Sequence, residues 1–336
     1  MDGRSAGGPP VAAYWSKAEG GAVECSLCFR RCSIAPGKRG ACGVRANDGG
    51  TMGLPLYGAA SAIAVDPIEK KPLHHFLPGS GVLSVGFYGC NLRCPFCQNW
   101  EISQDRSPAA PRRIEPRELV EAALRARAPS VAYTYSEPTV HFEFARDAMR
   151  LARAAGLRNV LVTNGSLREA PALELLELTD AANVDLKCWS AERYEKTLGG
   201  DLDAVRAFIS IAARTCHLEV TTLVVPGLSD GAEDMRAIAG FLADLPRSVP
   251  LHLSAYHPAW RFDEPPTAPE RLSRLAAIAR ERLEYVYVGN MPGEEANTAC
   301  PSCGKTVIRR RGYSIDARGL DSSGGRASCA GCGAPL

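Results

Sequence analysis

The chain has 336 residues, of which 46% are hydrophobic and 23% charged, and its formal net charge is only +2. Such a chain buries one large core and still carries small appendages, and its balanced charge gives no reason to expect nucleic acid as a partner. Residues 1–10 lack the basic and apolar regions of a signal peptide, and no apolar run approaches the about 18 residues of a membrane span. We therefore expect a soluble, cytoplasmic protein without a membrane partner.

In chain order, residues 1–80 are rich in Gly, Pro and paired cysteines, residues 81–293 repeat short strands and helices, and residues 294–336 are Cys-rich again. Seven strands are predicted, at 82–88, 131–135, 159–163, 183–187, 218–225, 250–255 and 284–288. Six helices are predicted between them, at about 116–127, 138–155, 168–179, 202–214, 231–244 and 269–282. This alternation predicts an α/β fold with right-handed βαβ units and a parallel sheet, as an open or closed barrel between two small metal-bound modules.

The thirteen cysteines are many for an intracellular chain, where metal or catalytic roles are more common than disulfides. Cys188 and Cys216 are expected to be packed thiols. The other eleven fall into three sets, which are Cys25, Cys28, Cys32 and Cys42; Cys90, Cys94 and Cys97; and Cys300, Cys303, Cys329 and Cys332.

The central set lies in the run GCNLRCPFCQN (89–99), directly after the first predicted strand. Its thiols therefore belong to a loop at the carboxyl end of that strand, where the active sites of parallel barrels form. A thiolate ordinarily holds each of the four irons of a cubane cluster, so three cysteines leave one iron open, as a catalytic metal requires. The amino and carboxylate groups of a methionine moiety would chelate that iron. The alternative is a zinc or redox-inert site with a fourth ligand from elsewhere.

The spacing C-x3-C-x-aromatic-C resembles the signature of the radical SAM superfamily, with Phe96 in the aromatic position that lies beside the adenine. The segments DPIEKKPLHHF (66–76), GCNLRCPFCQNWEISQ (89–104) and VYVGNMPG (286–293) resemble the radical SAM member of the AmmeMemoRadiSam system. The barrel is also similar to the pyruvate formate-lyase activating enzymes. These resemblances imply a partial (β/α)6-type barrel and a [4Fe-4S] cluster on Cys90, Cys94 and Cys97. They also imply reductive cleavage of S-adenosylmethionine to a 5′-deoxyadenosyl radical, which abstracts hydrogen from a substrate.

Polar residues end several other predicted strands. Ser136 and Glu137 follow the second strand, where the activating enzymes carry a Gly-Gly-Glu motif that contacts the amino group of S-adenosylmethionine; both glycines are absent here. The predicted cofactor-binding residues are Phe96, Ser136, Glu137, Asn164, Asp185, Lys187 and His257. Asn164 is included because it ends the third strand, where its amide would reach a ribose or carboxylate; the others follow from the resemblance. Structural readings compete for several of them: an ordinary helix start at Glu137, a turn at Asn164, an ion pair of Asp185 with Lys187, and a loop histidine at His257.

The two flanking cysteine sets differ in regularity. The C-terminal set reads CPSCG, then CAGCG after a 25-residue spacer, and this pairing of C-x2-C knuckles predicts a structural or docking zinc ribbon. An auxiliary iron–sulfur cluster is the alternative. The N-terminal set, C-x2-C-x3-C-x9-C, predicts either zinc or a second cluster, and its spacing does not choose between them.

The sequence therefore predicts a radical SAM enzyme that receives electrons from a donor such as flavodoxin or ferredoxin. The AmmeMemoRadiSam resemblance implies partner proteins of the AMMECR and Memo families, whereas the activating-enzyme resemblance implies a glycyl residue of a partner protein as target. A non-catalytic metal-binding scaffold and a zinc-dependent hydrolase are the rival classes; the hydrolase lacks clustered His and carboxylate ligands at the predicted barrel mouth. The substrate, the oligomeric state and the fate of S-adenosylmethionine stay open.

Overall fold

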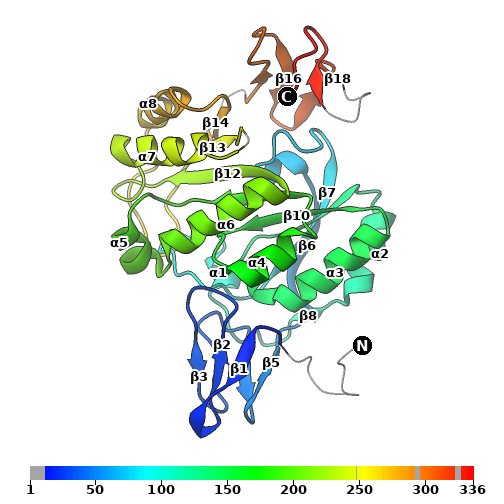
Figure 1. The fold of residues 1–336 in the computed structure, drawn as a ribbon, viewed down its shortest axis with the longest axis vertical. Helices are drawn as coiled ribbons and strands as arrows, with labels where there is room; N and C mark the ends of the chain where they lie inside the picture. Colours follow the sequence, from blue (N-terminus) through cyan, green and yellow to red (C-terminus); the bar gives the residue numbers. More distant parts are fainter. Residues whose placement is uncertain (1–11, 247, 292–295, 322–326) are drawn as a thin grey trace.

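The computed structural model describes residues 12–246, 248–291, 296–321 and 327–336. Figure 1 shows a central sheet covered by helices, with the N-terminal strands at one end of the molecule and the C-terminal strands at the other. In the part of the chain that is described, no helix is long and apolar enough to cross a membrane.

The central sheet has nine strands in the order β14-β13-β12-β11-β10-β9-β7-β6-β8, and the run from β7 to β14 is parallel. The seven predicted strands are confirmed within a few residues. They are β7 (Gly81–Phe87), β9 (Ser130–Thr134), β10 (Arg158–Thr163), β11 (Ala181–Asp185), β12 (His217–Val224), β13 (Leu251–Ala255) and β14 (Val286–Gly289). The predicted α/β fold class with a parallel sheet is therefore confirmed.

Six longer helices connect these strands, as predicted. They are α2 (Pro116–Arg125), α3 (Phe142–Ala154), α4 (Glu169–Leu176), α6 (Leu202–Thr215), α7 (Ala232–Ala243) and α8 (Pro269–Arg280). Local sequence fixes several of their starts: Glu115 and Glu118 form a reciprocal capping box on α2, and the Asp201 carboxylate accepts hydrogen bonds from the first turn of α6. The predicted helix at 138–155 begins instead with a separate 3₁₀ turn, η3 (Pro138–His141).

Shorter elements complete the barrel region. These are helix α1 (Trp100–Ser103), helix α5 (Ala191–Arg193) with the π turn η4 (Tyr194–Leu198), and the 3₁₀ turn η2 (Ile68–Lys70). A further 3₁₀ turn, η1 (Glu19–Gly21), lies in the N-terminal part of the chain. Two antiparallel strands, β6 (Ala59–Pro67) and β8 (Arg112–Arg113), extend the sheet beyond β7 and were not predicted. Because β6 pairs along the whole of β7, the central sheet reaches into the range 1–80 that the sequence assigned to a separate module.

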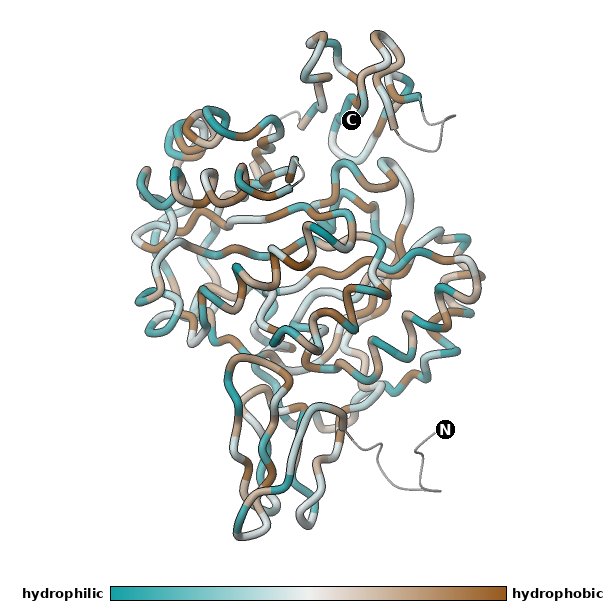
Figure 2. Tube along the Cα trace, viewed as in Figure 1, coloured by the Kyte–Doolittle hydropathy of each residue, from teal (hydrophilic) through white to brown (hydrophobic). Residues whose placement is uncertain are grey.

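The hydrophobic core lies between the sheet and the helices. Figure 2 shows apolar residues along the central strands, while hydrophilic residues alternate with them on the surrounding helices. Fully buried side chains such as Phe87, Tyr133, Phe144 and Phe208 belong to one continuous cluster. This packing holds the strands rigidly, and so fixes the loops that leave their carboxyl ends.

The N-terminal module packs against the carboxyl ends of the parallel strands. It contains β1 (Trp15–Lys17), β2 (Val23–Cys25) and β3 (Ser33–Ile34) in one sheet, and the hairpin of β4 (Ala46–Asp48) with β5 (Thr51–Gly53). The Phe29 N–H donates to the carbonyl of Ser166 at 3.2 Å, and the Arg168 N–H donates to the carbonyl of Leu27 at 3.1 Å. These bonds join the module to the loop that follows β10.

The C-terminal module lies at the opposite end of the sheet (Figure 1). Its strands are β15 (Thr298–Ala299), β16 (Thr306–Arg311), β17 (Ser314–Asp316), β18 (Leu320–Asp321) and β19 (Ser328–Cys329). Cys300, Val307, Ile308 and Cys329 form a small separate core there. The Arg310 guanidinium donates to the backbone carbonyl of His74, which ties the module to the amino ends of the barrel strands.

A buried network at these amino ends explains the paired histidines of the segment 66–76. The Glu219 carboxylate accepts from the backbone N–H groups of His74 (3.0 Å) and His75 (2.8 Å), and lies 2.6 Å from Nε2 of His252. Burial would raise the pKa of Glu219, but the hydrogen bonds from His217 and His252 outweigh it and hold the pKa well below its usual range. The network faces away from the cysteine loop and therefore supports the fold.

Candidate functional site

The central cysteines lie on the loop that leaves the carboxyl end of β7, as predicted. Gly89 begins this loop with φ +84°, and a Cβ there would lie 2.4 Å from the carbonyl oxygen of Cys42. Only glycine fits, because the left-handed backbone and the close contact both exclude a side chain. The N-terminal module therefore touches the loop immediately before Cys90.

Cys94 is buried, and Cys90 and Cys97 are half-buried. Burial raises the pKa of Cys90 well above its usual value. Burial also raises the pKa of Cys94 to about 11, although the nearby Lys187 ammonium opposes the shift. Without metal the thiols of Cys90 and Cys94 stay protonated at neutral pH, and metal binding releases their protons.

The spacing of the sulfur atoms separates two kinds of metal site. Within the described part of the chain, only Cys300, Cys303, Cys329 and Cys332 form a group of three or more potential ligands whose ligand atoms all lie within 4.8 Å of one another. The three central thiols do not form such a compact group, as expected for thiolates that bind different irons of a cluster.

Glu137 ties the carboxyl ends of β9 and β10 together. Its carboxylate is buried and accepts from the Thr139 N–H (3.0 Å), the Thr139 hydroxyl (2.6 Å), the Thr163 hydroxyl (2.7 Å) and the Asn164 N–H (2.7 Å). An ionised carboxylate offers about four lone-pair positions. A cofactor ammonium would therefore share Glu137 with these internal donors.

Asn164 links this network to the cysteine loop. Its Nδ2 lies 3.8 Å from Sγ of Cys90 and donates to Oδ1 of Asn91 at 2.9 Å. Ser136 directly precedes Glu137, and its buried Oγ has no hydrogen-bond partner among the described residues. An unpaired hydroxyl in this position is available to a bound ligand.

Asp185 and Lys187 form an ion pair at the end of β11, with 3.0 Å between Oδ2 and Nζ. Burial disfavours the Lys187 ammonium, but the Asp185 carboxylate and the Cys94 thiol favour it more strongly, so the pKa of Lys187 is raised. The side chains face the cysteine loop as a cation and an anion. Lys187 itself follows β11, which ends at Asp185, so strand alternation does not set its direction.

The other two predicted cofactor contacts differ in exposure. Phe96 is buried and packs edge-to-face against Tyr256 and Phe262, with ring centroids 6.5 and 6.1 Å apart. His257 is exposed, and its Nε2 lies 3.3 Å from the carbonyl oxygen of Asn290. The fold thus gathers Cys90, Cys94, Glu137, Asn164, Asp185 and Lys187 around the cysteine loop, whereas His257 lies on an outer loop.

Sequence reasoning missed two polar contacts near this site. Asn91 lies in the cysteine loop and accepts a hydrogen bond from the side chain of Asn164. Its position between Cys90 and Cys94 was the sequence feature that could have marked it as part of the site. Tyr135, with φ +70°, donates to Asp66 at 2.6 Å, and Asp66 also pairs with buried Lys71 at 2.8 Å. Burial would raise the pKa of Asp66, but hydrogen bonds from Lys71 and Tyr135 lower it.

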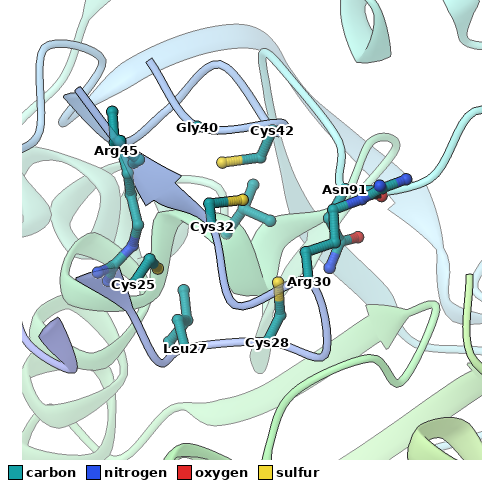
Figure 3. A pocket seen from close by; sticks show the side chains of 11 residues that line it. Cys25, Leu27, Cys28, Arg30, Cys32, Gly40, Cys42, Arg45 and Asn91 are labelled. Atoms are coloured by element: carbon teal, nitrogen blue, oxygen red, sulfur yellow. Dashed lines mark hydrogen bonds between the residues drawn. The ribbon is translucent and has the colours of Figure 1, made fainter. Parts of the chain in front are cut away.

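The flanking cysteine sets each converge in space. In the C-terminal set, Cys300 and Cys332 lie 3.7 Å apart, as do Cys303 and Cys329. A tetrahedral ion with metal–sulfur bonds of about 2.3 Å holds its sulfurs about 3.8 Å apart, so this spacing fits one zinc ion. The N-terminal cysteines 25, 28, 32 and 42 line a single pocket beside Asn91 (Figure 3).

Comparisons with known proteins agree with this geometry. The sequence model described as "Radical SAM superfamily" matches residues 84–242. An uncharacterized protein of Methanocaldococcus jannaschii is 41% identical over 316 residues, which are 92% of this chain and 94% of the relative. The pyruvate formate-lyase 1-activating enzyme of Escherichia coli is 26% identical over 186 residues, 53% of this chain and 76% of that enzyme. The structure of SuiB from Streptococcus suis bound to S-adenosylmethionine shares the fold, with a TM-score of 0.51 and 13% identity over 63% of this chain and 52% of SuiB.

Proposed function

The chain belongs to the radical SAM superfamily, and from that membership we propose that it cleaves S-adenosylmethionine reductively at a [4Fe-4S] cluster held by Cys90, Cys94 and Cys97. One observation carries the proposal: three thiols, one buried and two half-buried, lie on the loop at the carboxyl end of β7 and do not form a compact single-ion group. Homologues in this superfamily bind a [4Fe-4S] cluster and S-adenosylmethionine. When bound, the cluster supplies the electron that cleaves the sulfonium and yields a 5′-deoxyadenosyl radical for hydrogen abstraction.

The residues around the loop have distinct proposed roles. Lys187 and Asp185 offer an ammonium and a carboxylate to the opposite charges of the zwitterionic methionine group. Ser136 offers its unpaired hydroxyl, and Phe96 offers a ring face near the loop. Glu137 holds Asn164 beside Cys90 through the Asn164 N–H. His257 completes the proposed set from the outer loop.

The test is anaerobic reconstitution with iron and sulfide, followed by dithionite reduction with S-adenosylmethionine and chromatographic assay of 5′-deoxyadenosine. Cys94→Ala is expected to abolish the product. Cys216→Ala is the matched control, because Cys216 is also buried, lies outside the three cysteine sets, and donates to the carbonyl of Ala212 in α6. A loaded, reducible protein that binds S-adenosylmethionine without cleaving it would support the non-catalytic scaffold.

We propose proteins of the AMMECR and Memo families as partners, on the motif resemblance at 66–76, 89–104 and 286–293. Activation of a glycyl radical enzyme is the second candidate, supported by the similarity to the activating enzyme of Escherichia coli. Adding each candidate partner to the cleavage assay separates them. A glycyl radical on the partner, seen by electron paramagnetic resonance, is expected only in the second case.

We also propose a structural zinc ion at Cys300, Cys303, Cys329 and Cys332, supported by their mutual spacing. The two knuckles have the same local geometry, because the N–H of Gly304 donates to the backbone carbonyl of Cys300 and that of Gly333 donates to the backbone carbonyl of Cys329. All four thiols would be occupied, so this ion has no open position for catalysis. A cytoplasmic location and a flavodoxin or ferredoxin donor complete the proposal.

A further inference from the structure

The N-terminal cysteines form a site that the proposed function does not use. Three nearby segments bring them to one pocket: Cys25 ends β2, Cys28 and Cys32 flank the next turn, and Cys42 precedes Gly43. Figure 3 shows the four side chains around this pocket, with Arg45 and Asn91 approaching from different sides. Cys25 and Cys28 are buried, and the other two are half-buried. The fold therefore brings the four thiols together in a largely enclosed pocket.

The N-terminal thiols are not gathered as tightly as the C-terminal ones. Four sulfurs around one tetrahedral zinc lie about 3.8 Å apart, as the C-terminal set nearly does at 3.7 Å. Among the residues described, the C-terminal cysteines form a group compact enough to hold one ion, and the N-terminal cysteines do not. Thiolates on a cubane are held further apart, because each binds a different iron. The same chain thus contains one compact cysteine set and one expanded set, each with four members.

Two buried hydrogen-bond donors face the pocket. Arg45 is 1% exposed; its two terminal nitrogens donate to Ala13 and Glu143, but its Nε has no partner among the described residues. Asn91 is also 1% exposed, and its side-chain amide is placed to donate to the sulfur of Cys28. Buried donors are almost always paired, so the free Nε of Arg45 and the amide beside Cys28 both suit acceptor atoms at the site. The sulfur atoms of a cluster are such acceptors, and hydrogen bonds to them tune its potential.

The charges around the pocket suit a bound anion. Four thiolates and a cluster core carry net negative charge, which burial penalises unless cations lie close by. Arg45 lies beside Cys25 and Cys42, and Arg30 reaches across to the carbonyls of Asn91 (2.6 Å) and Gly199 (2.6 Å). Both guanidinium groups line the pocket.

We infer that Cys25, Cys28, Cys32 and Cys42 hold a second [4Fe-4S] cluster, with one thiolate on each iron. Unlike the central set, this set leaves no iron open, so the second cluster does not bind S-adenosylmethionine. It lies against the first site: the Cys42 carbonyl packs on Gly89, and Asn91 joins the pocket to Asn164 and Cys90. The cluster therefore adds a redox centre in direct contact with the catalytic loop.

The decisive protein is the full chain with Cys90→Ser, Cys94→Ser and Cys97→Ser combined, reconstituted anaerobically and desalted. Iron, acid-labile sulfide and zinc are then measured per folded chain. The wild type is expected to hold about eight irons and eight sulfides, and the triple variant about four of each, the content of one [4Fe-4S] cluster. Cys216→Ser, the buried-thiol control, should match the wild type. The sulfide measurement is essential, because a single iron ion bound to the C-terminal thiols would add iron without adding acid-labile sulfide.

A triple variant without sulfide overturns the inference, whether the N-terminal thiols then hold zinc or no metal. If the triple variant does not fold, the wild type decides: about eight sulfides support the second cluster, and about four refute it. Adding Cys28→Ser and Cys32→Ser to the triple variant should remove the remaining sulfide. These counts are independent of the proposed reaction, because a protein that fails to cleave S-adenosylmethionine can still hold two clusters.

Discussion

Replacing Glu137 with Gln turns one oxygen of a buried carboxylate into an NH₂ group. In the native protein, Oε1 accepts from the Thr139 N–H and from the hydroxyls of Thr139 and Thr163, while Oε2 accepts only from the Asn164 N–H at 2.7 Å. The best-placed amide keeps its oxygen at the Oε1 position. Its NH₂ group then faces the Asn164 N–H, and neither donor has an acceptor.

Each buried donor left without an acceptor costs about 1–3 kcal/mol. The loss of charge offsets part of this, because burial raises the pKa of Glu137 even though Thr139, Asn164 and Thr163 donate to its ionised form. We therefore expect Glu137→Gln to lower the free energy of unfolding by about 2–4 kcal/mol. Asn164 should also move away from Cys90, since its N–H loses its anchor.

Urea unfolding of the metal-free protein, followed by circular dichroism, measures this change. Thr163→Val removes one of the four donors and should cost about 1 kcal/mol. Glu121→Gln is the surface control; Glu121 pairs loosely with Arg125 at 3.6 Å and should change stability by less than about 0.5 kcal/mol. An unfolding free energy for Glu137→Gln equal to wild type would refute the reasoning. If that variant bound S-adenosylmethionine far more weakly as well, the carboxylate would be a direct cofactor ligand.

Three further outcomes follow from other buried groups. Glu219→Ala leaves the N–H groups of His74 and His75 without acceptors and should cost about 2–6 kcal/mol in urea unfolding. Burial lowers the pKa values of His75 and His141 to about 4, so between that pH and about 6.5 the unfolded chain binds more protons. Stability present above pH 6.5 is therefore lost as the pH falls toward 4, by about 3 kcal/mol for each histidine. Cys303→Ser should remove about one zinc per chain, measured by mass spectrometry of the metals, with no loss of iron.

Each of these has a control or a refuting result. Glu264→Ala, an exposed carboxylate, should leave the urea midpoint nearly unchanged. His141→Gln should flatten the pH dependence, and an unaltered slope would show that His141 titrates normally in the folded protein. Zinc that persists in Cys303→Ser would place the metal elsewhere, whereas iron in its place would favour the auxiliary cluster at the C-terminal knuckles.

The strand and helix pattern of the barrel was predictable because each element carries a local signal. The run VLSVGFY predicts β7 and the periodic segment 202–214 predicts α6, whose Asp201 cap is adjacent in sequence. The position of the central cysteines followed from the same logic, since they come directly after β7. In contrast, β6 escaped prediction, because its pairing with β7 is a long-range contact and its sequence, AASAIAVDP, has a mixed pattern of burial.

The sequence alone determined which residue types are grouped: three cysteines on a strand-end loop and two sets of four around it. It did not determine what each group contacts. Glu137 accepts from donors at the ends of two strands, and only the C-terminal cysteine set gathers into a compact group among the described residues. Those distances and partners come from segments far apart in the chain, and only the packing of the folded protein sets them. Tertiary structure therefore decided that the C-terminal thiols suit one ion, and that the N-terminal thiols, beside the catalytic loop, do not.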